Sequence, residues 1–568
     1  DRVRKLPTRE EVHSLPYGTW PGSSAQLPDL NARFCKPGGT FKLYPDQVQA
    51  LTEVGLAGGA GVLLSVGAGK TLVALLAGQM LDARRVMYFT LASAKDQVIR
   101  YDIPEYSRHF NIRTDNLSVH SHDELSARNG ATLLERCDPD LLILDEAHKY
   151  RHKTSTRTKR LLRFLREHPN VHVLWLSGTA TNASLKDYQH LLVASHHERA
   201  PIPLDHEALI EWDQCNAPVR QGKPREPGVL DALCRVGENV RAGYRRRLLS
   251  TVGVVGTTSS EALGTSLYYH RMDPAVPEVV QEALRNLEGT WTRPDGELFS
   301  DILSLHRARR QLAMGFYYRW VWPNGAPTED EQAWINARKA WHSKVRDQLA
   351  GLARPGMDSP WFLAAAAERG LAHAEGRLPA SQQHLPRWLD HGSPVAEWVE
   401  WKRYRHMPAP PREAVWLDSF AVEAAAAWSK EHPEGIIWTQ HEALGQAVSL
   451  VANIPYFGGG EQASKGIKDL QDQLVAQERH QCVVASLSAH GTAKNLQHAW
   501  SKMLYLEVPA NGTTMEQSVG REHRTGQRAD EVHVWIALHT QPLEEALCAA
   551  MLQASYIEET LGQRQKLI

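Results

Sequence analysis

Short apolar runs alternate with stretches of helical periodicity in two separate blocks of the chain. The first block extends from residue 41 to about 192, and its apolar runs are residues 61–64, 86–91, 141–144 and 171–176. The second extends from about 435 to 535, and its apolar runs are 436–438, 482–486, 503–508 and 532–538. Runs of this length between helical stretches are typical of β/α units around a parallel sheet. The pattern predicts two α/β lobes.

The stretch between these blocks has few strand-like runs and is rich in Trp, Arg and Pro. Residues 308–320 and 331–349 carry apolar residues at helical spacing with basic residues between them, so we expect a mainly helical insertion. The predicted order is an N-terminal extension at 1–40, a first lobe at 41–200, the insertion and linker at 201–412, and a second lobe at 413–568.

Length and composition agree with a multidomain protein. At 568 residues the chain exceeds what one hydrophobic core usually supports. Lys and Arg number 64 against 65 Asp and Glu, so the overall charge gives no reason to expect an anionic partner. The six cysteines form no CxxC pair and the 27 histidines no HExxH motif, so we expect no transition metal. No apolar run is long enough to cross a bilayer and the first residues lack a signal peptide's apolar stretch, which predicts a cytoplasmic protein without a membrane partner.

Residues 63–71, LLSVGAGKT, predict a phosphate-binding loop between an apolar run and a helical stretch. The glycines let successive backbone N–H groups point at phosphate oxygens, and the following helix adds the positive end of its dipole. Lys70 would reach the β and γ phosphates, and Thr71 would bind Mg²⁺. Leu64 stands where the longer GxxxxGKS/T pattern has its first glycine. The loop's expected nucleotide-binding residues are Gly67, Ala68, Gly69, Lys70 and Thr71.

The apolar run at 141–144 ends in two adjacent carboxylates, in the string LLILDEAHKY. At the end of a strand, Asp145 is placed to hold Mg²⁺, and Glu146 to polarise the attacking water as general base. Alone, the pair could be an ordinary acidic strand end. Because it follows a phosphate loop, it predicts a catalytic site.

GAGKT, DEAH and VLWLSGTAT (173–181), in this order, resemble motifs I, II and III of superfamily 2 helicases. The resemblance implies two RecA-like lobes, each a parallel sheet flanked by helices, that bind ATP and Mg²⁺ between them. It also implies that KLYPDQVQAL (42–51) contains an adenine-reading residue, Gln47. Residues that would couple the ATP site to nucleic acid are His148, Ser177, Thr179 and Thr181.

The string QSVGREHRTGQ, residues 517–527, resembles motif VI of the same superfamily. The resemblance gives Gln517 a nucleotide contact. Arg521 and Arg524 would stabilise charge on the γ-phosphoryl oxygens, because a guanidinium is planar and permanently charged. An exposed basic helix is the alternative interpretation, which the order of the motifs disfavours.

The extended form GREHRTGQ, together with SLSAHGTAKNLQHA at 486–499, resembles the Snf2-like branch and most of all its members in phages and prophages. For a phage protein, the expected compartment is the host cytoplasm. The branch's motif V core, GxGxNL, starts at Gly491 here, with Ala493 in place of the second glycine. The resemblance implies a nucleotide contact at Gly491 and a nucleic-acid contact at Asn495.

Directly after DEAH, residues 149–166 contain eight Lys or Arg and no acid. Such a local cluster can neutralise backbone phosphates in a protein of near-zero net charge, although a solvated helix face is the plainer alternative. The Arg, Trp and Tyr mixture at 307–322 could stack on bases, but aromatic residues at helical spacing more often form a core. The predicted phosphate contacts are Lys149, Arg151, Lys153, Arg157, Lys159 and Arg160.

Together these features predict an ATP-dependent translocase that moves on duplex DNA. A helicase that separates strands of DNA or RNA is the alternative within the enzyme class. A catalytically silent nucleic-acid scaffold is less favoured, because all five of the expected catalytic residues are present: Lys70, Asp145, Glu146, Arg521 and Arg524.

Overall fold

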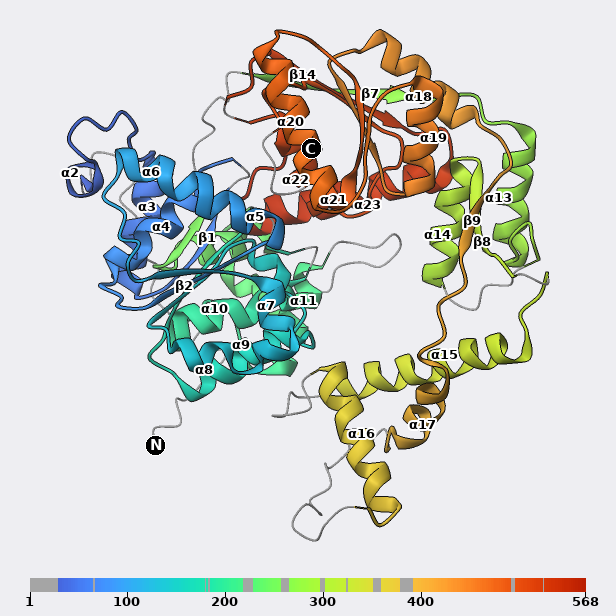
Figure 1. The fold of residues 1–568 in the computed structure, drawn as a ribbon. Coiled ribbons are helices and arrows are strands. Elements are labelled where there is room, and N and C mark those ends of the chain that lie inside the picture. Colours follow the sequence, from blue (N-terminus) through green and yellow to red (C-terminus); the bar gives the residue numbers. More distant parts are fainter. Residues whose placement is uncertain are drawn as a thin grey trace.

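The structure is a computed structural model of the α/β class with two parallel six-stranded sheets, each flanked by helices (Figure 1). It describes residues 29–64, 67–178, 180–181, 184–217, 228–256, 265–296, 302–322, 325–350, 359–377, 392–491, 496–524 and 526–568. Among these residues, no helix combines the length and the apolar character that crossing a membrane requires.

The first sheet lies in the N-terminal lobe, and its strands are almost entirely buried except for the edge strand β3, which is partly exposed. In spatial order they are β3 (Leu117–Ser121), β2 (Val86–Thr90), β4 (Leu141–Leu144), β5 (His172–Leu176), β1 (Ala60–Leu63) and β6 (Val254–Gly256). Successive side chains of a strand point to opposite faces, so continuous apolar runs are what a sheet covered on both faces requires. Tyr88 and Ile143 pack on one face against α3 and α4, whereas Phe89 and Leu144 pack on the other against α9 and α10.

Eleven helices of this lobe lie within the described residues. They are α2 (Leu30–Phe34), α3 (Pro45–Ala57), α4 (Lys70–Met80), α5 (Ala92–Gln97), α6 (Ile103–His109), α7 (His122–Ser126), α8 (Leu133–Cys137), α9 (Thr156–Glu167), α10 (Gln189–His196), α11 (His206–Asn216) and α12 (Val240–Leu249).

The second sheet lies in the C-terminal lobe. In spatial order its strands are β11 (Tyr456–Phe457), β12 (Val483–Ser486), β10 (Gly435–Thr439), β13 (Lys502–Tyr505), β14 (Glu531–Ala537) and β7 (Ser266–Met272). The helices of this lobe are α18 (Phe420–Glu431), α19 (Glu442–Ala452), α20 (Glu461–Ala476), α21 (Leu487–His490), α22 (Gly512–Glu522) and α23 (Gln541–Leu561).

Two strands of these sheets come from the stretch that the sequence assigns to the insertion. β6 pairs with β1 of the first sheet, and β7 pairs along its whole length with β14 of the second. The chain therefore passes from one lobe to the other between residues 256 and 266. β6 has only three residues, and β7 is an edge strand with alternating exposure, so neither forms a continuous apolar run.

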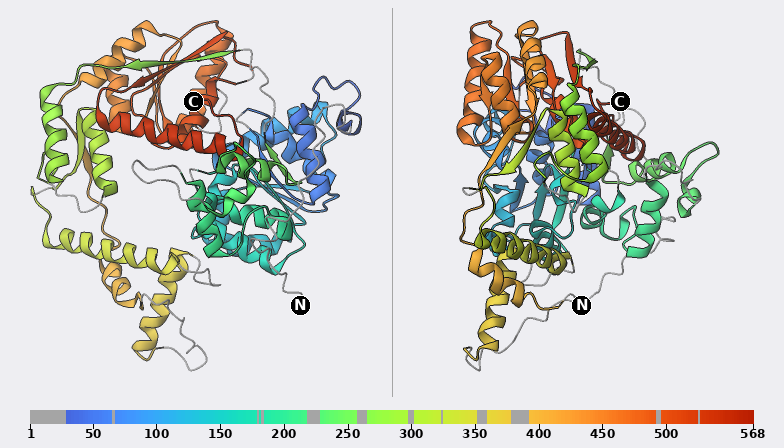
Figure 2. Two further views of the ribbon diagram at one scale, coloured as in Figure 1. Left: turned by 180° about the vertical axis from the view of Figure 1, so that it is seen from behind. Right: turned by 90° about the vertical axis from the view of Figure 1, so that its right-hand side faces the viewer.

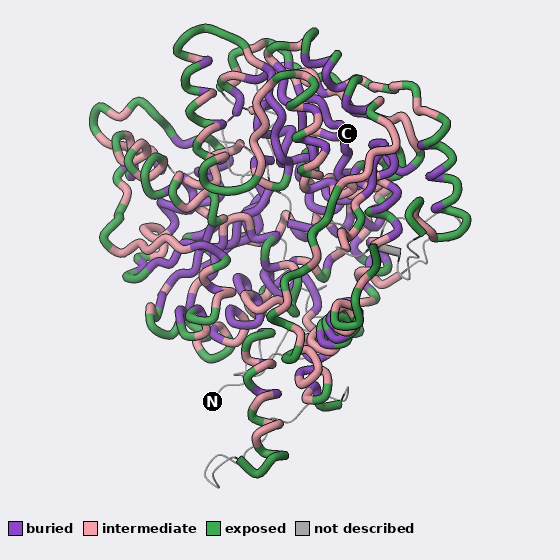
Figure 3. Tube along the Cα trace, turned by 45° about the vertical axis from the view of Figure 1, so that its right-hand side comes forward, coloured by how far each residue is buried: buried purple, intermediate pink, exposed green. Residues whose placement is uncertain are grey.

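Residues 278–416 leave the second lobe and return to it. Their elements are α13 (Glu278–Thr290), α14 (Ile302–Ala313), β8 (Phe316–Trp320), α15 (Glu329–Ala350), α16 (Pro360–Ala374), α17 (Val395–Tyr404) and β9 (Arg412–Trp416). β8 and β9 form an antiparallel pair, and Phe316 of β8 packs into the core of the second lobe. Helices α15–α17 share a small hydrophobic core of their own. Most of the buried residues lie in the two lobes (Figure 3).

The last helix, α23, packs on both lobes. Ala546 and Ala550 belong to the core of the second lobe, whereas Ile557 and Leu561 belong to a core of the first. Near the C-terminal end of the helix, Glu559 accepts a 2.6 Å bond from Arg241 of α12. Seen from behind, α23 extends from beneath the second sheet to the first lobe (Figure 2).

Candidate active site between the lobes

A cavity of about 660 Å³ lies where the two lobes meet. Nine residues that the sequence predicts to bind or hydrolyse ATP line it: Gln47, Gly67, Gly69, Lys70, Thr71, Asp145, Glu146, Arg521 and Arg524. The first seven come from the N-terminal lobe and the two arginines from the C-terminal lobe. Three of the predicted nucleotide-binding residues, Ala68, Gln517 and Gly491, are not among the residues that line it.

The predicted phosphate loop leads from β1 to the first residue of α4. Gly67 and Gly69 have φ angles of 93° and 73°, in the left-handed region that favours glycine. A Cβ at Gly69 would also lie 2.2 Å from Nε2 of Gln47, so the side-chain amide of Gln47 would have to move. Lys70 donates to the carbonyl of Leu64 at 3.0 Å, which holds its side chain back along the loop. Desolvation lowers the pKa of Lys70, against the charges of Glu146 and Asp145, which raise it.

Gln47 connects α3 to this loop. Its Oε1 accepts from the backbone N–H of Tyr44 at 3.0 Å, and its Nε2 donates to the carbonyls of Ala68 and Gly69, each at 3.3 Å. Both ends of the amide are thereby engaged within the protein. Contact with an adenine base stays a prediction.

Three donors orient the carboxylate of Asp145 at the end of β4. Tyr88 and Thr90 donate to Oδ2 at 3.0 and 3.2 Å, and the backbone N–H of Glu146 donates to Oδ1 at 3.0 Å. Burial, together with the neighbouring charge of Glu146, raises the pKa of Asp145 to about 6. Sequence reasoning missed both hydroxyls, although they lie on β2, which pairs with β4, and the ends of neighbouring parallel strands meet at one edge of a sheet.

Glu146 has a φ of 50°, which few non-glycine residues adopt and which often marks a functional site. Its Oε2 lies 3.2 Å from Nδ1 of His148 and accepts from Nε2 of Gln517 at 3.3 Å. Burial alone would raise the pKa of Glu146, but His148, Lys70 and Arg521 together lower it to about 2. Glu146 is therefore ionised at neutral pH. Gln517, predicted to contact nucleotide, instead reaches this carboxylate across the lobe interface.

Arg521 lies in the last turn of α22, and Arg524 is the second residue after the helix. The Nε of Arg521 donates to the carbonyl of Gln517 at 3.2 Å. Burial and the charge of Arg524 lower the pKa of Arg521 to about 10, and burial also lowers the pKa of Arg524. A guanidinium stays charged at neutral pH. Two cations beside a glycine-rich loop and a helix N-terminus suit a polyanionic ligand.

The residues predicted to couple the two sites lie in the first lobe. Ser177 is buried, and its carbonyl accepts a 3.0 Å bond from Nε2 of Gln563, which follows α23. The hydroxyl of Thr181 lies 2.9 Å both from the carbonyl of Ser184 and from Oδ2 of Asp187. Thr179 lies outside the described residues. No pattern in the sequence predicts that Gln563 would contact Ser177.

The basic stretch after DEAH divides into surface residues and buried ones. The predicted phosphate contact is wrong for Arg160, which is 1% exposed and donates to the carbonyls of Leu125 and Ala127. It is also wrong for Lys159, which is buried and donates to the carbonyl of Leu349. Sequence cannot separate such cations from exposed ones, because their carbonyl partners come from distant segments.

The other four predicted phosphate contacts stay at least partly accessible. Lys149 and Lys153 are exposed, and Arg151 and Arg157 are half-buried. Lys153 donates to Gln189 at 2.5 Å, and Arg157 pairs with Asp123 at 3.4 Å. Of the two residues predicted from the motif V resemblance, Gly491 follows α21 and its backbone N–H donates to the carbonyl of Leu487 at 2.9 Å, whereas Asn495 lies outside the described residues.

The donors in the cavity suit a hard cation. Among the described residues, no three His, Cys, Asp or Glu side chains gather as they would at an all-protein metal site. Mg²⁺ does not need such a cluster, because it commonly takes one or two protein oxygens and completes its shell with water and phosphate. The carboxylate of Asp145 and the hydroxyl of Thr71 line the same cavity.

No protein-family model matches this sequence, and no curated protein matches it. What the chain does must therefore be inferred from its own residues.

Proposed function

We propose that the protein is an ATP-dependent motor of the superfamily 2 type that moves on duplex DNA. One observation carries the proposal. A phosphate loop and an ionised glutamate from one lobe face two arginines from the other lobe across a single cavity. Such a site can respond to nucleotide by drawing the lobes together, which is the movement a motor requires.

The proposed hydrolysis assigns one task to each group. The backbone of residues 67–71 and the ammonium of Lys70 would hold the β and γ phosphates, and Lys70 would exchange the Leu64 carbonyl for phosphate oxygens. Glu146, ionised and oriented by His148 and Gln517, would accept a proton from the attacking water. Arg521 and Arg524 would stabilise the negative charge on the transferred phosphoryl group.

Mg²⁺ fits this site, with Asp145 and Thr71 as its protein ligands. When bound, it would neutralise phosphate charge during phosphoryl transfer. Tyr88 and Thr90 donate hydrogen bonds to Asp145 and so fix the orientation of its carboxylate.

Accessible basic residues support the assignment of nucleic acid as the partner. Lys149, Arg151, Lys153 and Arg157 directly follow the catalytic carboxylates, so a phosphate backbone bound there would lie next to the ATP site. Such contacts fix position without reading bases, which suits a protein that travels along DNA of any sequence.

The test is ATP turnover with matched amounts of single-stranded DNA, duplex DNA, forked DNA and RNA. We expect duplex DNA to stimulate phosphate release most strongly. Lys70→Ala should bind nucleotide at least about tenfold more weakly, because it loses the ammonium that holds the phosphates. Nucleotide affinity unchanged in this variant would contradict the phosphate loop, and turnover without any nucleic-acid stimulation would contradict the motor. Stimulation by single strands alone would favour the strand-separating alternative.

A further inference from the structure

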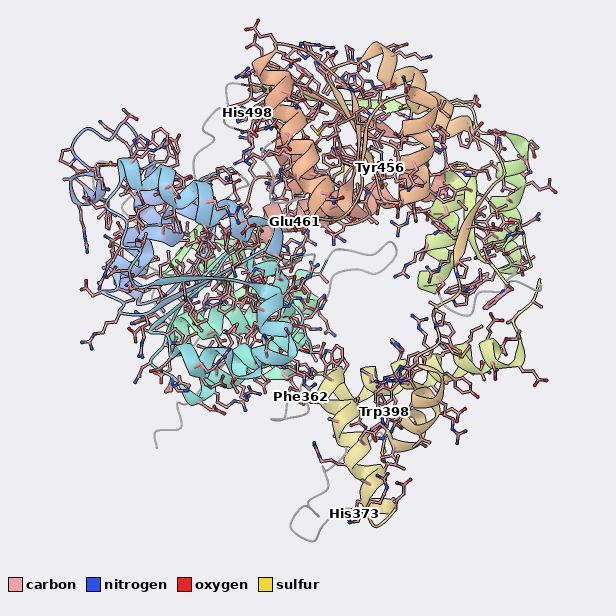
Figure 4. All side chains as sticks on the ribbon, viewed as in Figure 1. Phe362, His373, Trp398, Tyr456, Glu461 and His498 are labelled. Carbon is pink, nitrogen blue, oxygen red and sulfur yellow. The ribbon has the colours of Figure 1, made fainter. Side chains whose placement is uncertain are left out.

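Helices α15–α17 form an arm that extends from the second lobe and ends against the first. The β8–β9 pair joins the arm to the second lobe, where Phe316 and Trp416 pack together. At the other end of the arm, the start of α16 lies beside the first lobe, at the labelled residue Phe362 (Figure 4).

Among the described residues, two contacts join this far end to α9 of the first lobe. Lys159 donates to the carbonyl of Leu349 at 2.5 Å. Leu349 belongs to the last turn of α15, whose carbonyls have no partner within the helix and form the negative end of its dipole. The guanidinium of Arg160, fixed by two backbone carbonyls of its own lobe, lies 5.8 Å from the centre of the Phe362 ring. We call this pair of contacts the latch.

The arm is a folded unit rather than a loose loop. Trp341 and Trp398 are buried in its core and pack against each other. Glu368 of α16 accepts from Trp398 at 2.8 Å and pairs with Lys402 of α17 at 2.7 Å. The three helices therefore move together, and the latch is where the arm can separate from the first lobe.

With the latch closed, the two lobes and the arm surround an opening. Figure 4, which draws the described side chains, shows none of them filling this space. One side of the opening is α15, whose 22 residues give a length of about 33 Å. The diameter of a DNA double helix is smaller than this length.

The first-lobe side of the latch is basic. Helix α9 contains five Lys or Arg and one acid, whereas α15 contains four Lys or Arg and four acids over its whole length. Cations beside the opening attract a polyanion, and its binding there would release counterions.

We propose that the arm closes around duplex DNA, with Lys159 and Phe362 as the latch that keeps the ring shut. The proposal rests on the proposed motor function and adds to it a topological link between protein and DNA. Opening of the latch admits DNA from the side, and closure prevents release except at a free end. A closed ring keeps a translocating protein on its DNA without the need for tight phosphate contacts.

The test compares a nicked circular plasmid with the same plasmid cut once. The protein is bound at about 50 mM salt, and its release is timed after a shift to about 200 mM, where phosphate contacts weaken steeply. We expect at least tenfold slower release from the circle than from the linear form. Phe362→Ala and Lys159→Ala should each abolish the difference, while ATP turnover without DNA stays unchanged. Trp361→Ala is the matched control, since its side chain is the neighbouring aromatic and is 67% exposed.

Each other outcome counts against the ring. Equal release of the wild-type protein from circle and linear DNA would overturn the ring alone and leave the motor intact. Slow release from the circle that persists in both latch variants would show that Lys159 and Phe362 do not close it. Failure to bind any DNA at low salt would overturn the motor and the ring together.

Discussion

At the scale of single residues, the proposed ATP hydrolysis depends most directly on Glu146. Its backbone is left-handed, its carboxylate lies beside His148 and Gln517, and His148, Lys70 and Arg521 together lower its pKa to about 2. We expect Glu146→Gln to bind ATP as the wild type does but to lose at least about 100-fold in turnover, because the amide cannot accept the proton. Nucleotide titration and phosphate release measure the two effects separately. Turnover at the wild-type rate would remove Glu146 from the mechanism.

A second residue, Glu516 of α22, makes stability depend on pH. It is buried and accepts a 2.7 Å bond from the backbone N–H of Lys566, and burial raises its pKa to about 7. The folded state thus binds this proton more tightly than the unfolded state, whose pKa is near 4.5. The stability that the proton contributes is present below pH 4.5 and is lost as the pH rises through about 7.

Between these pH values we expect the wild type to lose about 2 to 3 kcal/mol relative to Glu516→Gln, whose amide does not titrate. Urea denaturation at pH 5, 6, 7 and 8 measures the difference. Glu282→Gln, an exposed exchange on α13, should follow the wild type at every pH. Parallel pH profiles for the wild type and Glu516→Gln would show that Glu516 does not carry this proton.

At the scale of elements, α23 joins the two lobes. Ile557 and Leu561 are fully buried in a core of the first lobe, although the helix belongs by sequence to the second. Leu561→Ala should therefore destabilise the protein by about 2 to 5 kcal/mol through the cavity it leaves. Hydrogen exchange should also rise in α12 of the first lobe. Leu552→Ala, on the same helix at 56% exposure, should change stability by less than about 0.5 kcal/mol. Faster exchange confined to the second lobe would contradict the joining role.

Burial explains which strands could be predicted from the sequence. Eight apolar runs correspond to β1, β2, β4, β5, β10, β12, β13 and β14, most of whose residues are buried, so hydrophobicity alone marks them. β3 and β7 lie at the edges of their sheets and are partly exposed, which leaves no continuous run. The boundaries of the lobes were missed for the same reason, because β6 and β7 lie in the stretch assigned to the insertion.

The candidate site was predictable where the residues are close in sequence. The phosphate loop, the acidic pair and the two arginines each form a compact motif, and the fold brings all three to one cavity. Tyr88, Gln563 and the latch residues come from segments tens to hundreds of residues away from their partners. Only the packing of distant elements reveals such contacts.

At the scale of the whole molecule, the arm bears on whether the motor parts the strands of DNA. Trp334, Trp341 and Trp398 of the arm are buried within it, so none of the three is exposed as a wedge between strands. Among the described residues of the arm, Trp361 is the large aromatic side chain left most exposed, which makes it the candidate wedge to test. We expect the protein to travel along the duplex without opening it.

Triplex displacement distinguishes travel along a duplex from unwinding, because a third strand can be removed without separating the other two. We expect ATP-dependent displacement of the third strand, whereas unwinding of a simple fork should be weak or absent. Displacement should stop in Glu146→Gln, which binds ATP but cannot use it. It should persist in Trp361→Ala, because no wedge is required. Robust fork unwinding that Trp361→Ala abolishes would instead make Trp361 a wedge and the protein a strand-separating helicase.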